Sequence, residues 1–331
     1  MDSNPTEIER VTIGIIFLIL NLLTILGNAL LVSTFISKRN YFSKLPFFEF
    51  YYHLIFAILI VNFNQLTVIF PSTILPDDIL QGYKETIFYD IFCEADTFGY
   101  NLSILLLLSL SIDRLLIFAF PRFFTTDNKY RIRMYIILCW LITVTLIIVH
   151  RIFSVYKKYN RQEYSLYYEI NSVMGSEIFK GFTVNLSTIT PIILFISYFF
   201  CFIKLRLNNK KVQSIVQNRN WNFERQILLQ GCTISLVYEL EAVFFLQRLY
   251  FVKLLNIQNV RYFNIFVNTF AMLYTGSISV TLYTFNRVAR EHLISLFKRL
   301  SKNSNKISST TRNDNDKYKN KLVAYNNWTN K

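Results

Sequence analysis

A few charged side chains lie inside long apolar stretches of this 331-residue sequence, and they are its most chemically informative residues. Asp113 and Arg114 are adjacent, whereas Asp96, Glu239 and Glu241 are carboxylates with mainly apolar neighbours. Ionisable groups are expensive to place within an apolar, lipid-facing segment, so each of them is a candidate functional residue. Such side chains can hold a ligand or form an ion pair that a structural change releases.

The cysteines and histidines are spaced too widely for a metal or catalytic cluster. The four Cys include no Cys-x-x-Cys pair, and the three His are scattered. Zinc sites and disulfide frameworks depend on closely spaced or paired cysteines. We therefore expect no metal site, no cofactor and no enzymatic activity.

The segments that carry the charged residues are long and strongly apolar. The composition is 53% hydrophobic and only 17% charged, whereas soluble domains average about 25% charged residues. A helix needs about 20 apolar residues to cross a bilayer, and its backbone groups must bond internally there. The predicted fold class is an all-α membrane protein, a seven-transmembrane helix bundle. Its predicted spans are Val11–Ser37, Pro46–Phe70, Tyr89–Phe120, Ile132–Phe153, Gly181–Lys204, Arg225–Val252 and Tyr262–Phe285.

The distribution of charge predicts the orientation of this bundle. With the N-terminus outside, most of the 35 Lys and Arg fall in cytoplasmic loops and the C-terminal tail. Cytoplasmic loops carry the excess of basic residues in membrane proteins, which favours an N-terminus outside and a cytoplasmic C-terminus. The same placement accounts for the net charge of +14 without a nucleic-acid partner. We expect a multi-pass protein of the cell membrane, with the lipid bilayer as one partner.

The domain organisation follows from these spans. Residues 1–10 are the predicted extracellular N-terminus, and residues 11–285 are the seven-transmembrane helix domain. Residues 286–300, NRVAREHLISLFKRL, have apolar side chains at helical spacing among basic ones. This pattern predicts a short amphipathic helix on the membrane surface, with a frayed helix end as the alternative. Residues 301–331 are rich in Asn, Ser and Lys and are predicted to form a disordered cytoplasmic tail.

The adjacent pair Asp113 and Arg114 lies at the predicted inner end of the third span, in the stretch SLSIDRLLIFAFP. There the arginine can pair with its neighbour or with another span, and it can leave that partner when the bundle rearranges. The alternative is an ordinary arginine whose side chain reaches out to the membrane interface.

The stretch LSLSIDRLLIFAFP resembles the third-span signature of rhodopsin-like G protein-coupled receptors, in which Asp-Arg-Tyr precedes a Pro that lies seven residues after the Arg. Leu115 replaces the Tyr, and Pro121 keeps the spacing. The resemblance covers about residues 11–300. Further features agree with the family in order and in span: Gly27-Asn28, Trp140 and Pro191.

The resemblance implies a receptor that binds a small-molecule or peptide ligand between its outer helix ends and activates a heterotrimeric G protein. It implies roles in G protein coupling for Asp113, Arg114, Glu224 and Tyr283. For Glu224, a loop charge is the alternative to a partner that holds Arg114 in the resting state. Structural roles in the helix bundle are expected for Asn28, Ser103, Trp140 and Pro191.

Asp96 is the candidate ligand anchor. It precedes Arg114 by eighteen residues, or five helical turns, so both side chains share one face and lie about 27 Å apart along the axis. Amine receptors of the family carry their ligand-pairing carboxylate at this spacing. The alternative is an acidic outer rim that Asp96 forms with Asp90 and Glu94. The predicted ligand-binding residues are Asp96, Tyr100, Glu241 and Tyr274, of which Tyr274 is one position out of the family register.

The chain also departs from the family pattern. The second span has no central Asp, the sixth lacks Cys-Trp-x-Pro, and the seventh ends in SVTLY instead of Asn-Pro-x-x-Tyr. The outer loop before the fifth span has no Cys to pair with Cys93, and the seventh span has no Lys to which retinal could attach. Such erosion is similar to that of nematode serpentine chemoreceptors, so we expect a chemosensory receptor.

Two other classes of membrane protein stay open. A seven-span ligand-gated channel, resembling insect olfactory receptors, would place the N-terminus inside, against the distribution of charge. A membrane transporter is disfavoured because the sequence shows no internal repeat and no helices interrupted by Gly and Pro.

Overall fold

The computed structural model describes residues 5–45, 48–120, 129–170, 174–211, 218–255 and 259–299. The chain divides into two units, Met1–Phe285 and Asn286–Lys331. In the second unit, residues 287–299 are helical, and Arg287 and Glu291 form an ion pair of 2.6 Å one turn apart. The location of this helix on a membrane stays a prediction, and the predicted disordered tail lies outside the described residues.

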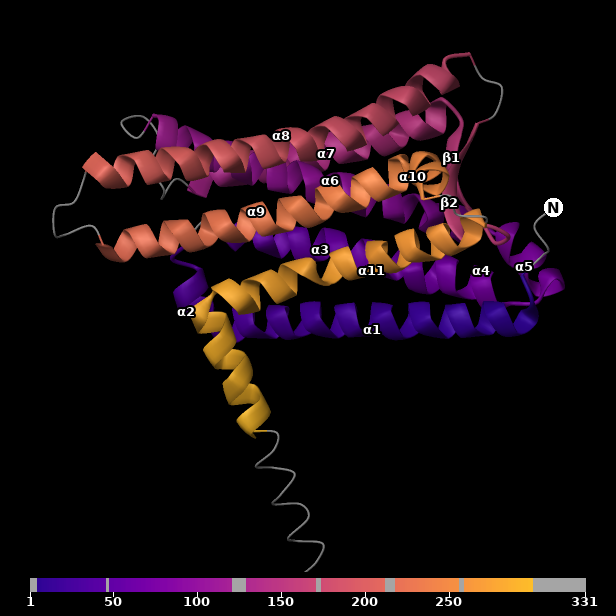
Figure 1. Cartoon of the computed structure of the whole chain (residues 1–331), viewed down its shortest axis with the longest axis horizontal. Coiled ribbons are helices and arrows are strands. Elements are labelled where there is room, and N and C mark those ends of the chain that lie inside the picture. Colours follow the sequence, from indigo (N-terminus) through magenta and orange to yellow (C-terminus); the bar gives the residue numbers. More distant parts are fainter. Residues whose placement is uncertain are drawn as a thin grey trace, which may run out of the picture. The chain divides into compact units, whose positions relative to one another are not determined.

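The first unit is a bundle of helices with one β-hairpin (Figure 1). Within the described residues, seven helical segments are long and apolar enough to cross a membrane, which confirms the predicted seven-helix fold. The orientation of the termini stays a prediction. The helices and strands are α1 Glu7–Ser37, α2 Arg39–Phe42, α3 Phe48–Asn64, π-helix η1 Gln65–Ile69, α4 Phe70–Ile74, α5 Asp77–Lys84, α6 Ile87–Ala119, α7 Lys129–Ile152, β1 Val155–Asn160, β2 Ser165–Ile170, α8 Ser176–Lys211, α9 Asn218–Leu246, α10 Arg248–Leu254 and α11 Val260–Phe285.

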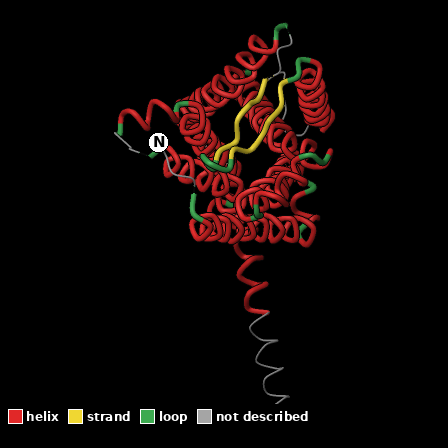
Figure 2. The backbone as a smooth tube through the Cα atoms, turned by 90° about the vertical axis from the view of Figure 1, so that its right-hand side faces the viewer, coloured by secondary structure: helices red, strands yellow, loops and turns green. Residues whose placement is uncertain are grey.

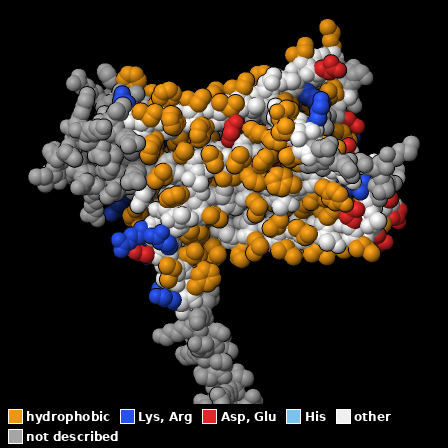
Figure 3. Space-filling model, viewed as in Figure 1, with side chains coloured by type: hydrophobic (Ala, Val, Ile, Leu, Met, Phe, Trp, Pro, Cys, Tyr) orange, Lys and Arg blue, Asp and Glu red, His pale blue; other side chains and the backbone are white. Residues whose placement is uncertain are grey.

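The outer flank of the bundle explains why these helices belong in lipid. Large apolar side chains such as Ile19, Leu138 and Phe200 are each more than half exposed on it. Apolar side chains cover the flank in Figure 3, whereas Asp and Glu gather at its right-hand end. A surface of this kind is stable against hydrocarbon, where hydrogen bonds within each helix satisfy the backbone.

Helix α6 is central in the bundle, because it packs against α3, α7, α8 and α9. Its contact with α3 requires Gly99: a Cβ atom there would lie 2.6 Å from the carbonyl oxygen of Ala57. Small residues allow such close approach between membrane helices. One continuous helix therefore fixes both Asp96 and Arg114, near its two ends.

The loop between α7 and α8 folds into an antiparallel hairpin of β1 and β2, in a register from Val155↔Ile170 to Asn160↔Ser165. The sequence predicted an outer loop without strands at this position. Figure 2 shows the two strands lying across one end of the ring of helices. The hairpin therefore covers the space between those helix ends.

The bounds of several spans differ from the predicted ones, and the differences in the second and the sixth affect the interior of the bundle. The second continues through η1 to Ile74, and its π-helical turn inserts an extra residue that changes the facing of the residues beyond. The sixth was predicted to continue to Val252, but α9 ends at Leu246 and α10 begins after Gln247. The polar pair Gln247 and Arg248 interrupts the apolar run there. The expectation that Arg248 lies in the sixth span is therefore wrong.

Candidate functional site

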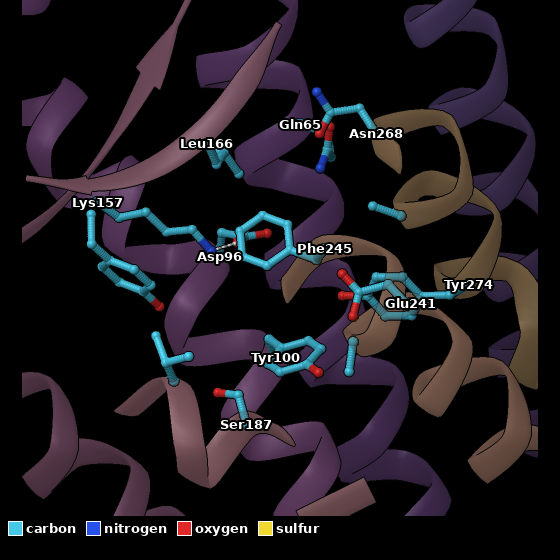
Figure 4. Close-up of a pocket in the computed structure, with 14 residues that line it drawn as sticks. Gln65, Asp96, Tyr100, Lys157, Leu166, Ser187, Glu241, Phe245, Asn268 and Tyr274 are labelled. Carbon is cyan, nitrogen blue, oxygen red and sulfur yellow. Dashed lines mark hydrogen bonds and ion pairs between the residues drawn. The ribbon is translucent and has the colours of Figure 1, made fainter. Parts of the chain in front are cut away.

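A cavity beneath the hairpin joins residues of α6, α8, α9, α11 and both strands (Figure 4). About 610 Å³ of it is free of protein atoms, including space open to solvent, and ≈ 50 Å³ admits the centre of a water molecule. All four residues predicted to bind ligand line this cavity: Asp96, Tyr100, Glu241 and Tyr274.

Asp96 has a partner within the chain. Its carboxylate forms an ion pair with the ammonium group of Lys157, which β1 carries into the cavity. Both residues are buried, with exposed fractions of 8% and 7%. Burial by itself lowers the pKa of Lys157, but the neighbouring Asp96 carboxylate outweighs it, so this pKa lies above the ordinary lysine value. Lys157 therefore keeps its charge at neutral pH.

Glu241 reaches the cavity from α9 and lies in a different environment. Its side chain is buried, and within the described part of the chain no ion pair involves it. Tyrosine rings from three helices gather beside it: the ring centroids of Tyr238 and Tyr274 are 5.0 Å apart, and those of Tyr100 and Tyr274 are 6.3 Å apart. Glu239 is only half-buried and does not line the cavity, as the spacing of two residues on a helix implies.

The hairpin is held over the cavity by polar contacts. The four cysteines of the chain, Cys93 included, are free thiols, so no disulfide ties the hairpin to α6. Contacts from the hairpin reach α4, α5, α6 and α11 instead. They are Arg161 with Asp77 and with the Leu75 carbonyl, Tyr159 with Thr73 at 2.8 Å, the Lys157 amide with Glu94 at 3.2 Å, Arg261 with the Gln162 carbonyl at 2.9 Å, and Asn268 with the Tyr164 carbonyl.

The opposite end of α6 carries Asp113 and Arg114, both fully buried. Arg131, at the start of α7, donates to Asp113: its Nε and Nη2 are each 2.8 Å from Oδ1. Arg114 Nη2 lies 3.7 Å from the other oxygen, Oδ2. Arg114 thus faces the bundle interior and lies near its neighbour, as predicted, but the shorter bonds to Asp113 come from Arg131.

The other two residues predicted to take part in coupling are less informative. The hydroxyl of Tyr283 lies 3.2 Å from that of Thr34, which links α11 to α1. The side chain of Glu224 lies outside the described residues, so its pairing with Arg114 stays a prediction.

The four residues with predicted structural roles lie within the bundle: Asn28, Ser103, Trp140 and Pro191. The buried Asn28 amide donates to the carbonyl of Thr275 at 3.0 Å and joins α1 to α11. Trp140 Nε1 donates to His53 Nδ1 at 3.3 Å and joins α7 to α3. Ser103 donates to a carbonyl of its own helix, and Pro191 lies buried inside α8.

Sequence reasoning missed Lys157, Gln65 and Asn268, all of which line the cavity. The hairpin pairs VYKKYN with SLYYEI, and side chains alternate between the faces of a strand. Lys157 accordingly points inward, whereas Lys158 is more exposed and pairs with Glu169 at 2.5 Å. Because this segment was predicted to be a loop, the sequence did not indicate that Lys157 and Lys158 point to opposite faces.

Comparison with known proteins indicates the fold. The chain is similar in structure to squid rhodopsin, with a TM-score of 0.69 at 14% sequence identity over 90% of this chain and 88% of that one. No family model matches the sequence, and no curated protein matches it. The chain therefore has a rhodopsin-like seven-helix fold, with a cavity beneath the hairpin at one end and a buried Asp-Arg pair at the other.

Proposed function

We propose that this protein is a G protein-coupled receptor, of a chemosensory kind similar to the nematode serpentine receptors. A small extracellular ligand binds in the cavity beneath the hairpin, and a heterotrimeric G protein binds at the opposite end of the bundle. The observation that carries the proposal is the continuity of α6, which lines the cavity with Asp96 and Tyr100 and holds the buried Asp113 and Arg114 at its other end.

The mechanism requires two states of the bundle that the ligand binds with different affinity. A ligand that contacts α6, α9 and α11 in the cavity favours the state in which the inner end of α9 moves away from α6. Arg114 then leaves its position beside Asp113 and contacts the G protein. No covalent bond changes in this process.

The test is activation of a G protein by the membrane-expressed receptor, measured against a panel of odorants, amines and peptides. We expect a ligand response that Arg114→Ala abolishes while surface expression holds. Arg133→Ala is the matched control, because Arg133 is an exposed arginine near the same membrane face, on α7. A ligand-evoked current without G protein activation would contradict the proposal and favour a ligand-gated channel.

A further inference from the structure

The cavity is lined by more carboxyl groups than ammonium groups. Two carboxylates, Asp96 and Glu241, and one ammonium group, Lys157, line it. Lys157 pairs with Asp96, and Glu241 belongs to no ion pair within the described residues. A buried carboxylate is costly unless a counter-charge or hydrogen bonds compensate it. The Tyr100 side chain forms a hydrogen bond with Glu241, and a cationic ligand would supply the counter-charge that this carboxyl group does not have.

The aromatic side chains beside Glu241 favour the same kind of ligand. Tyr100 and Tyr274 line the cavity together with Glu241 (Figure 4), whereas the ring of Phe245 faces the Lys157 ammonium group at 5.7 Å. The face of an aromatic ring attracts an organic cation, most strongly where water is excluded, and a carboxylate next to such rings adds the opposite charge. Neutral or anionic ligands gain neither contribution.

We propose that the ligand of this cavity is a compact organic ammonium compound with a single positive charge, bound by Glu241 and the surrounding aromatic rings. Because Lys157 already pairs with Asp96, the carboxylate that binds the ligand is Glu241 and differs from the Asp96 anchor that the family resemblance implied. The inference rests on the proposed function of this cavity as the ligand site.

The test measures binding directly, by thermal stabilisation of the purified full-length receptor in lipid nanodiscs. Two pairs of probes separate charge from shape: choline with its neutral carbon isostere dimethylbutanol, and phenethylamine with phenylethanol. We expect both cations to stabilise the receptor and both neutral compounds to fail. Glu241→Gln should weaken binding of the cations about ten- to a hundredfold, as the loss of a charged hydrogen-bond partner does.

Matched variants locate the site. Glu239→Gln removes a carboxylate two residues away that does not line the cavity, and it should leave cation binding unchanged. Lys157→Met releases Asp96 as a second carboxylate, and it should strengthen cation binding. The melting temperature of each variant without a probe shows whether it is folded.

Equal stabilisation by a cation and its neutral isostere, or no stabilisation by either cation, would overturn the proposal. Cation binding that Glu241→Gln leaves unchanged would overturn the assignment of the acceptor. These binding measurements need no G protein, so a wrong ligand class can be distinguished from a wrong proposed function. A receptor that activates a G protein without preferring cations keeps that function and loses this ligand class.

Discussion

Replacing Arg131 with Ala tests how the C-terminal end of α6 is stabilised. Asp113 is fully buried, and two nitrogens of Arg131 lie 2.8 Å from one of its oxygens. Removal of one partner from a buried ion pair costs about 3–5 kcal/mol, because the other charge stays buried. Arg114 lies 3.7 Å from the second oxygen and compensates part of the lost positive charge. We therefore expect Arg131→Ala to lower the free energy of unfolding by roughly 2–4 kcal/mol.

The opposite substitution should cost more, because Asp113 is the partner of two guanidinium groups. The Arg131 side chain is 12% exposed and can turn toward water after Asp113→Ala. Arg114 is fully buried and keeps its charge there without the Asp113 carboxylate, so the loss should be about 3–5 kcal/mol. The double variant should be more stable than the sum of the two single losses predicts, because the residues act as a pair.

The assay is the melting temperature of the purified receptor in nanodiscs, measured for both single variants and the double variant. Arg133→Ala serves as control, because Arg133 lies two residues along the same helix and pairs with Glu49 at the surface. It should leave the melting temperature unchanged within error. The reasoning is refuted if Asp113→Ala is no more destabilising than Arg131→Ala, or if the two losses are simply additive.

Three further predictions concern the bundle and the hairpin. Asn28→Ala should destabilise the receptor by about 1–3 kcal/mol, seen as a lower melting temperature, because the Thr275 carbonyl loses a buried donor. Gly99→Leu should abolish surface expression, since even a Cβ would clash with α3, whereas Gly82→Ala, with no atom within 4 Å of the new Cβ, should express normally. The stability that Lys157 contributes through its raised pKa should be complete below about pH 10, the ordinary lysine range, and should disappear as the pH rises further. Melting temperatures of wild type and Lys157→Met should therefore converge only at strongly alkaline pH.

The sequence predicted the features that depend on long apolar runs and on helical spacing. Seven spans follow from hydropathy because each helix meets lipid along its length. The shared face of Asp96 and Arg114 follows from the period of a single uninterrupted helix. The angle between positions two residues apart implied that Glu239 and Glu241 point to different faces, so that only one of them could enter the cavity.

Contacts between segments that are distant in the chain could not be predicted from the sequence. Lys157 meets Asp96 only because the loop after α7 forms a hairpin that folds back over the helix ends. Arg131 and Asp113 lie on different helices, and the helical period of one segment does not predict its contacts with another. Gln65 enters the cavity within a π-helical turn, and the sequence around it does not differ from an ordinary apolar helix.

The attachment of the hairpin also has a consequence for biosynthesis. A disulfide forms over seconds to hours and needs an oxidant, whereas hydrogen bonds and ion pairs form as soon as the segments meet. With all four thiols free, the hairpin can reach its place over the helix ends without an oxidase or a disulfide isomerase. Dithiothreitol, which opens the outer loops of disulfide-tied proteins, should leave this hairpin in place.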